Sequence, residues 1–145
     1  MMIQRKVILV DNNSADVALA TQVFKAVPLP LEVIHLRDGE SLTNYVRQNP
    51  LGNVALVLIS LNLHGQPSTL DILKSFYTDQ HYKKLPIIVF STSKNKEDIL
   101  SCYEYGANAY VHKPLDQSDY EKVIQNIAHF WGDVNVLPTY DYENA

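Results

Sequence analysis

The chain has 145 residues, of which 46% are apolar, 10% aromatic and 19% charged. This length and composition predict one globular domain with its own core, and they exclude a disordered or collagen-like chain. Twelve basic and sixteen acidic residues give a net charge of −4, so a protein that binds nucleic-acid phosphates is not expected. The only cysteine, Cys102, excludes a disulfide framework and a cysteine-rich zinc site.

The start of the chain argues against a signal peptide. The first six residues lead into a short apolar run without the small-residue cleavage site of a signal peptide. No apolar stretch reaches the roughly 18 residues that suggest a membrane span. We therefore expect a soluble, cytoplasmic protein that does not act at a membrane.

Five short apolar runs divide the chain, at residues 6–10, 31–36, 54–59, 86–90 and, more weakly, 109–111. The first, third and fourth runs are continuous and rich in β-branched residues. This is typical of strands that are buried on both faces of a parallel sheet.

Helical patterns lie between and after these runs, because apolar residues recur there at steps of three and four. The positions are Val17, Ala20, Phe24 and Val27, then Leu42, Tyr45 and Val46, then Leu70, Leu73, Phe76 and Tyr77, then Ile99, Leu100 and Tyr103, and finally Tyr120, Val123, Ile127 and Trp131. Ser14 is the expected N-cap of the first helix, and Pro28 and Pro30 end it. Gly106 is expected just beyond the end of the fourth helix. The alternation predicts an α/β fold, a doubly wound parallel sheet with helices on both faces.

Polar residues follow four of the five runs. They are Asp11, Asn12 and Asn13, then Ser60 and Asn62, then Ser91, Thr92 and Ser93, and finally His112 and Lys113. In a sheet of this kind, ligand chemistry collects at the carboxyl ends of the strands. The sequence therefore predicts a pocket with one acid, several amides and hydroxyls, and one lysine.

Several short motifs occur in a fixed order, each at the end of an expected strand. They are the turn at 10–13, Asp38-Gly39, Leu61-Asn62-Leu63, the segments 85–91 and 106–110, and Lys113-Pro114. Together they resemble the receiver domain of two-component response regulators, the CheY-like family. The resemblance implies a (βα)5 flavodoxin-like three-layer sandwich with strand order 2-1-3-4-5. We expect the receiver domain over residues 1–131 and a tail over 132–145 that is docked or partly disordered.

A narrower resemblance concerns the end of the chain. Phe130-Trp131 and Val136-Leu137-Pro138 are similar to a stand-alone subgroup related to cyanobacterial phytochrome response regulators.

The resemblance implies a phosphoryl-transfer site from which this chain departs. In the family an aspartate after the third strand accepts a phosphoryl group from a kinase phosphohistidine, two acids after the first strand help to hold Mg²⁺, and a hydroxyl and a lysine contact the phosphoryl group. Here Ser60 stands at the acceptor position and Asn12 at the second acid, whereas Asp11, Ser91 and Lys113 match the family.

We therefore expect a degenerate pocket with no intact catalytic group and no enzymatic activity. Mg²⁺ binding is expected to be lost or weak, because a single carboxylate is a poor magnesium site. No other cofactor or metal is expected, since the five histidines show no ligand spacing.

Two interpretations remain open for several residues of the pocket. Asp11 and Lys113 either pair with each other or with nearby backbone, or they are vestiges of catalysis. Ser60 is either a small polar filler or a site for a serine kinase. Ser91 and Tyr110 match the family's switch pair, in which the ring follows the hydroxyl. Without phosphate this pair either rests in one state, or Tyr110 simply packs on the fourth helix.

Four tyrosines fall on or next to the fourth helix, fifth strand and fifth helix, the face that receivers use for dimers and targets. They are Tyr103, Tyr105, Tyr110 and Tyr120, and tyrosine is enriched at interface cores. They are interpreted as an interface, with core and rim positions as the alternative. Tyr140 and Tyr142 are expected on a solvated end, or as an extension of that interface.

The expected function is a phosphorylation-independent protein-interaction module in a phosphorelay. A sensor histidine kinase or a downstream effector is the expected partner, with a homodimer through the same face as a further option. One alternative is a domain that binds a small molecule or an anion. Another is a receiver that still switches with phosphate, which requires an acid near Ser60; Asp16 and Asp38 are the only candidates nearby in the sequence.

Overall fold

The computed structural model describes residues 3–138 and 140. Its sheet consists of the parallel strands β1 (Arg5–Val10), β2 (Leu31–Leu36), β3 (Val54–Ser60), β4 (Ile87–Ser91) and β5 (Ala109–His112). The strand order is β2-β1-β3-β4-β5, which confirms the predicted topology.

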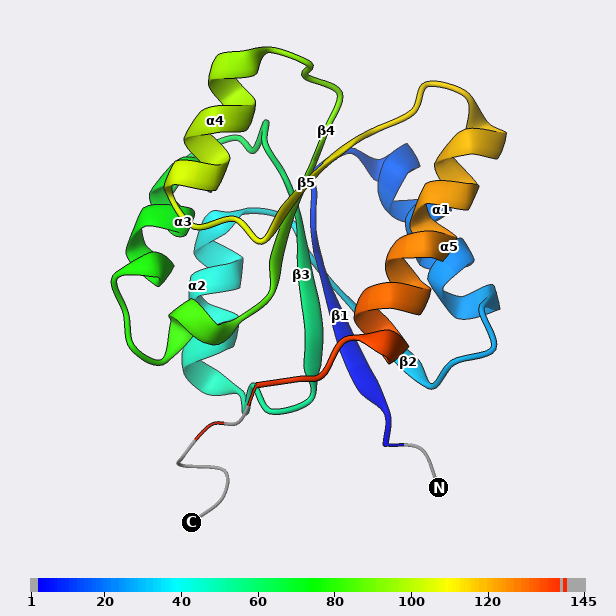
Figure 1. Cartoon of the computed structure of the whole chain (residues 1–145), viewed down its shortest axis with the longest axis horizontal. Coiled ribbons are helices and arrows are strands. Elements are labelled where there is room, and N and C mark those ends of the chain that lie inside the picture. The colour runs from blue at the N-terminus through cyan, green and yellow to red at the C-terminus, as the bar shows by residue number, and fades with distance from the viewer. Residues whose placement is uncertain (1–2, 139, 141–145) are drawn as a thin grey trace.

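Helices cover both faces of this sheet (Figure 1). On one face lie α1 (Ser14–Ala26) and α5 (Gln117–His129), and on the other lie α2 (Gly39–Gln48), α3 (Thr69–Tyr77) and α4 (Lys96–Glu104). A short helix, η1 (Tyr82–Lys84), precedes β4, and a single wide turn, η2 (Phe130–Val134), follows α5. The predicted doubly wound, three-layer fold is thus confirmed.

The two central strands β3 and β4 are buried along their whole length, as continuous aliphatic runs in a parallel sheet require. Their side chains alternate between two apolar clusters, one on each face. One cluster, under α2, α3 and α4, includes Val57, Ile59, Ile87 and Val89, and the other, under α1 and α5, includes Leu56, Leu58, Ile88 and Phe90.

The expected helix ends are confirmed except for one cap. The N-cap of α1 is Asn13, whose side chain accepts a hydrogen bond from the Asp16 amide, and Ser14 is the first residue of the helix. The prediction of Ser14 as the N-cap is therefore wrong by one position. The Asn13 amide oxygen caps the helix instead, since asparagine and serine side chains both accept hydrogen bonds at an N-cap. Gly106, with a φ of +97°, follows α4 as predicted.

The segment after α5 runs past the amino-terminal ends of the strands toward the side of α2 and α3 (Figure 1). Arg5 Nη1 donates to the Asn135 carbonyl at 3.1 Å. Tyr140 is only 1% exposed, and its ring lies edge-on to His81 with 4.7 Å between centroids. The expectation that Tyr140 lies on a solvated end is therefore wrong, because its ring belongs to the apolar cluster on the α3 side. Tyr142 lies outside the described residues.

Within residues 3–138 and 140, no helix has the length and apolarity needed to cross a lipid bilayer.

Candidate functional site

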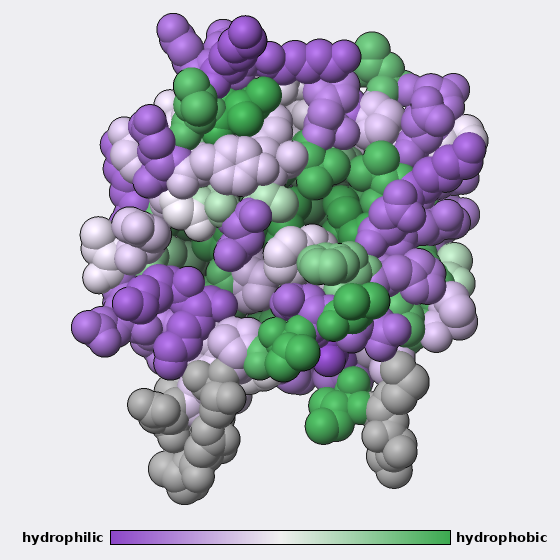
Figure 2. All heavy atoms as spheres, in the orientation of Figure 1, coloured by the Kyte–Doolittle hydropathy of each residue, from purple (hydrophilic) through white to green (hydrophobic). Residues whose placement is uncertain are grey.

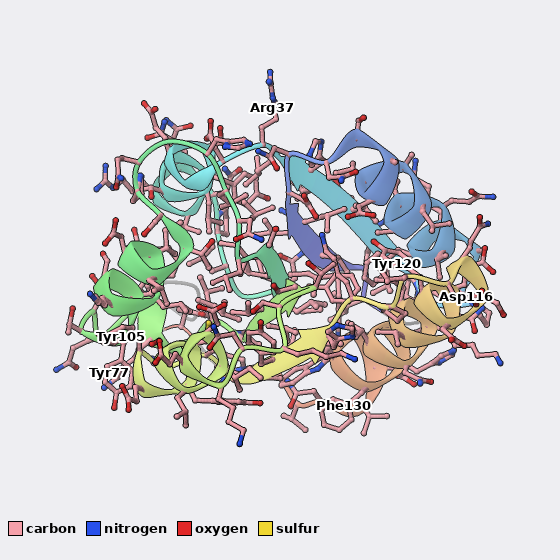
Figure 3. All side chains as sticks on the ribbon, turned by 90° about the horizontal axis from the view of Figure 1, so that it is seen from above. Arg37, Tyr77, Tyr105, Asp116, Tyr120 and Phe130 are labelled. Atoms are coloured by element: carbon pink, nitrogen blue, oxygen red, sulfur yellow. The ribbon has the colours of Figure 1, made fainter. Side chains whose placement is uncertain are left out.

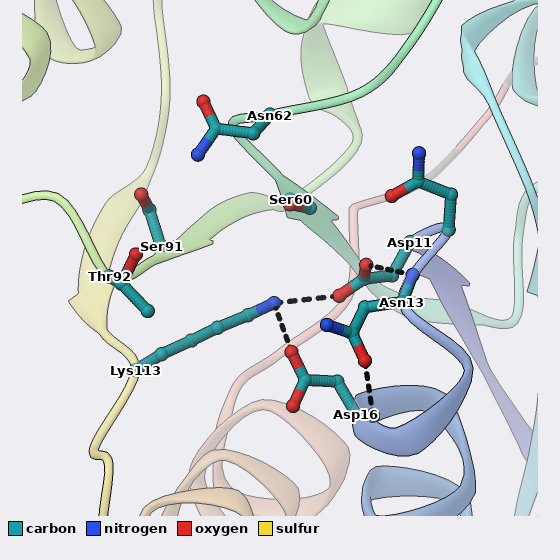
Figure 4. A pocket seen from close by; sticks show the side chains of 9 residues that line it. Asp11, Asn13, Asp16, Ser60, Asn62, Ser91, Thr92 and Lys113 are labelled. Carbon is teal, nitrogen blue, oxygen red and sulfur yellow. Dashed lines mark hydrogen bonds and ion pairs between the residues drawn. The ribbon is translucent and has the colours of Figure 1, made fainter.

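The carboxyl ends of β1, β3, β4 and β5 meet around one polar pocket (Figure 4). All five residues of the predicted degenerate site line it, together with four others. The lining residues are Asp11, Asn12, Asn13, Asp16, Ser60, Asn62, Ser91, Thr92 and Lys113. Only Asp11, Asp16 and Lys113 carry a charge, and two carboxylates with one ammonium make the lining negative by one charge.

The Lys113 ammonium is held between two carboxylates. Its Nζ lies 2.8 Å from Asp11 Oδ2 and 2.9 Å from Asp16 Oδ2. The lysine and Asp11 side chains are only 8% and 5% exposed, whereas the Asp16 side chain is 30% exposed. Buried charges require such partners, and Asp11 also accepts from the Asn13 amide through Oδ1, at 2.9 Å. Asp11 and Lys113 are therefore paired.

Asp16 belongs to this pocket although it matches no site position of the family. It lies in the first turn of α1, and its backbone N–H donates a hydrogen bond to Asn13 Oδ1 at 3.0 Å. Its carbonyl accepts from the Tyr120 hydroxyl at 3.3 Å. The sequence signal was its place at the start of a helix, where a side chain leans back toward the preceding strand end.

Asp38, the other acid considered near Ser60, is not part of the pocket lining. It is the N-cap of α2 and accepts from the Ser41 amide at 2.8 Å. That backbone hydrogen bond lowers the pKa of Asp38 below its usual value, as hydrogen bonding to a carboxylate does.

Ser60 ends β3 in the middle of the pocket and is 8% exposed. Its carbonyl accepts from the Thr69 hydroxyl at 2.6 Å, which ties the start of α3 to the strand end. Within the described part of the chain, none of the hydrogen bonds links the Ser60 hydroxyl to a carboxylate or an imidazole. A serine without such a base is a weak nucleophile.

The two residues of the predicted switch pair both contact Ser93, in the loop between β4 and α4. The Ser91 hydroxyl oxygen accepts from the Ser93 amide at 3.0 Å. The Tyr110 hydroxyl donates to the Ser93 carbonyl at 2.8 Å. Ser93 in turn donates through its hydroxyl to Asp98 Oδ2 at 2.6 Å. Sequence analysis places Ser93 after the fourth strand but does not predict these contacts, since only the folded loop brings the Ser93 backbone between Ser91 and Tyr110.

The four predicted interface tyrosines do not share one surface. Tyr103 on α4 is 49% exposed, and its hydroxyl accepts from the half-buried Tyr110 amide at 3.1 Å. Tyr105 faces α3, where Lys74 Nζ lies 4.4 Å from its ring centroid. In the view of Figure 3, Tyr105 lies on the α3 side of the molecule, away from Phe130 at the end of α5.

Tyr120 is a core residue, so its assignment to an interface is wrong. It is 4% exposed, and its ring centroid lies 5.4 Å from that of Phe90. The physical reason is the apolar stripe of α5, which turns Tyr120, Ile124 and Ile127 toward the sheet. Burial raises the pKa of the Tyr120 hydroxyl well above its usual value, and the negative charges of Asp16 and Asp11 raise it further.

No metal-binding cluster occurs among the described residues, since no three His, Cys, Asp or Glu side chains there are grouped to hold an ion. The two carboxylates that line the pocket both face the Lys113 ammonium. Asn12, where the family has its second acid, is exposed and offers only an amide oxygen.

Known proteins match this chain over most of its length. The model of the response regulator receiver domain family matches residues 7–125. Response regulator Rcp1 of Synechocystis sp. is 30% identical over 138 residues, which make up 91% of this chain and 92% of Rcp1. Chemotaxis protein CheY of Pseudomonas aeruginosa is 21% identical over 122 residues, covering 84% of this chain and 94% of CheY.

Solved structures match in the same way. The phosphorylated cyanobacterial phytochrome response regulator RcpA has a TM-score of 0.86 and 30% identity, covering 94% of this chain and all of that one. The Mn²⁺-bound form of Rcp1 has a TM-score of 0.84 and 29% identity, covering 93% and 99%. The sheet order, the pocket at the strand ends and these matches lead to one conclusion: the chain belongs to the response regulator receiver domain family of two-component signalling.

Proposed function

We propose that this receiver domain is a protein-interaction module whose conformation is set without phosphorylation. The observation that carries the proposal is Ser60 at the acceptor position, in a pocket whose lysine is already paired with Asp11. A phosphoryl group on an aspartate cannot form where no aspartate stands. The family's aspartyl-phosphate chemistry is thus absent, and the domain performs no reaction of its own.

The pocket residues do not fit Mg²⁺. A magnesium ion requires near-octahedral oxygen ligands and usually one or two carboxylates. Asp11 and Asp16 each direct an oxygen to Lys113, at 2.8 and 2.9 Å, and the ammonium repels a second cation at that place. We infer that the domain works without a metal or another cofactor.

The negative pocket also argues against the alternative of an anion-binding domain. Its lining carries two carboxylates for one ammonium. A free anion would meet net repulsion there, since no further positive charge lines the pocket.

The proposed contact surface is the face of α4, β5 and α5, where exposed apolar side chains are interspersed with polar ones (Figure 2). Leu100 and Tyr103 on α4 are 60% and 49% exposed, and Phe130 just after α5 is 49% exposed. Exposed apolar groups of this kind suit a protein partner. We assign this face to a sensor histidine kinase or a downstream effector in the cytoplasm, or to a second copy of the chain, and not to nucleic acid or a membrane.

Intact-mass measurement after incubation with acetyl phosphate and Mg²⁺ tests the proposal. The wild-type chain is expected to keep its mass. A triple variant, Asn12→Asp with Ser60→Asp and Asp16→Asn, restores the two missing carboxylates, removes the second carboxylate partner of Lys113 and is expected to gain one phosphoryl group. A mass gain of the wild type that disappears in Ser60→Ala would contradict the proposal.

A further inference from the structure

Asp16 is the charged residue of the pocket to which the family pattern gives no role. Its carboxylate lies 2.9 Å from Lys113 Nζ, next to the 2.8 Å contact from Asp11. The ammonium also lies 5.5 Å from the centroid of the Phe90 ring. Since an ammonium has three N–H donors, two carboxylates and an aromatic face leave it little room for another acceptor.

The position of Asp16 is set from two sides. Its backbone N–H is bound by the Asn13 cap at 3.0 Å, and its carbonyl accepts from the Tyr120 hydroxyl at 3.3 Å. Tyr120 is itself packed on Phe90, with 5.4 Å between ring centroids. The carboxylate is therefore presented to Lys113 by the packing of α1 against α5 and β4, and a place in the first turn of a helix also favours its negative charge.

We propose that Asp16 is an internal counter-ion that keeps Lys113 from binding anions and so decides which ligands the pocket admits. With Asp16 in place, the pocket excludes phosphate and similar anions. Without it, the lining would carry one carboxylate and one ammonium, and Lys113 would have one more N–H donor available for an anion. This inference rests on the proposed phosphate-independent function and gives it a structural cause besides the loss of the acceptor aspartate.

A titration with inorganic phosphate at constant ionic strength, followed by amide NMR, tests the role of Asp16. The variants are Asp16→Asn and Asp16→Ala, which remove the charge with and without an amide in its place. Asp119→Asn is the matched control, because Asp119 is an exposed carboxylate in the first turn of α5 and does not line the pocket.

Both Asp16 variants are expected to show saturable shifts at Ser91, Thr92 and Lys113. Their affinity for phosphate should be at least about tenfold above that of the wild type, because the negative charge that repels an anion beside the Lys113 ammonium is gone. The wild type and Asp119→Asn are expected to show none. Phosphate binding that is equally weak in all four proteins would overturn the role of Asp16 while leaving the proposed function intact. Phosphate binding by the wild type as tight as in the variants would also overturn it, and a phosphoryl group found on the wild-type chain by mass would separately overturn the proposed function.

Discussion

Lys113 joins three parts of the domain through one ammonium. It follows β5, and its two carboxylate partners belong to the end of β1 and the first turn of α1. Such a charge is stable in a buried pocket only while its partners remain. The lysine that serves phosphoryl transfer elsewhere in the family therefore has a structural task in this chain.

Replacing Lys113 by alanine should lower the free energy of unfolding by about 3 kcal/mol, because Asp11 would keep a buried charge without its cation. Lys122→Ala is the control, since Lys122 is exposed on α5, and it should change stability by less than about 0.5 kcal/mol. Denaturant titrations of both variants measure the difference. Unchanged stability and unchanged partner binding in Lys113→Ala would mean that the pair does not hold the pocket.

Cys102 should make stability fall at alkaline pH. Burial raises the pKa of its thiol from 9.0 to about 11, with a further contribution from the charge of Asp98. Between these values the unfolded chain loses the proton that the folded chain keeps, so rising pH favours the unfolded state. Denaturant titrations between pH 8 and about 10 should therefore show a smaller loss of stability in Cys102→Ala than in the wild type. Equal losses would show that the thiol is not protected.

The residues of the pocket could be predicted to different degrees. Asp11, Ser60, Ser91 and Lys113 could be placed together because each follows a strand of one parallel sheet. The contact between Asp16 and Lys113 could not, because it depends on how far α1 leans toward the end of β5. The enrichment of tyrosine at interfaces does not predict the place of Tyr120, because the apolar stripe of α5 turns it into the core.

At the scale of the elements, the loop between β4 and α4 is braced by hydrogen bonds to Ser93. Ser91 lies before this loop, Asp98 lies in the first turn of α4, and Tyr110 lies on β5. All three contact Ser93 at 2.6 to 3.0 Å. These contacts support a loop that rests in one arrangement, with the Tyr110 ring tied to it.

The end of α4 depends on glycine at position 106. Gly106 has a φ of +97°, and a Cβ there would lie 2.5 Å from the Tyr77 ring. Gly65 has a φ of +80° with open space around it, so it is a matched control. Gly65→Ala should cost about 1 kcal/mol, the usual price of a left-handed backbone, and Gly106→Ala about 1 kcal/mol more, because of overpacking. Equal midpoints in thermal unfolding would contradict the steric role of Tyr77.

The predicted strands agree with the observed ones apart from their ends. β3, β4 and β5 extend one residue further than the apolar runs, to Ser60, Ser91 and His112. Backbone pairing continues there regardless of the side chain, since a ladder needs only N–H and C=O groups. Apolar patterning predicts which segments are strands, but it cannot predict the last polar residue that still pairs.

At the scale of the whole molecule, the segment after α5 connects two opposite sides of the sheet. Arg5 binds the Asn135 carbonyl near β1, and Tyr140 is buried against η1 on the side of α3. The sequence of this segment lacks periodicity, so its docking could not be predicted from local pattern. It depends on contacts with His81 and with the apolar cluster on the α3 side, which form only in the folded chain.

Tyr140→Ala should lower the free energy of unfolding by about 3 kcal/mol, because it leaves a cavity where an aromatic ring was buried. Val136→Ala is the control in the same segment, since Val136 is 87% exposed. Its effect should stay below about 0.5 kcal/mol. Chemical denaturation curves that coincide for the two variants would mean that the segment does not stabilise the domain.

The central claim is that the conformation of this receiver does not respond to phosphate chemistry. Amide NMR during addition of Mg²⁺ and then beryllofluoride, a mimic of the phosphoryl group, tests it most directly. We predict no saturable shift at Asp11, Ser60 or Ser91, and no change at Tyr110. Saturable shifts that begin in the pocket and reach Tyr110 would contradict the claim and identify the domain as a receiver that still switches.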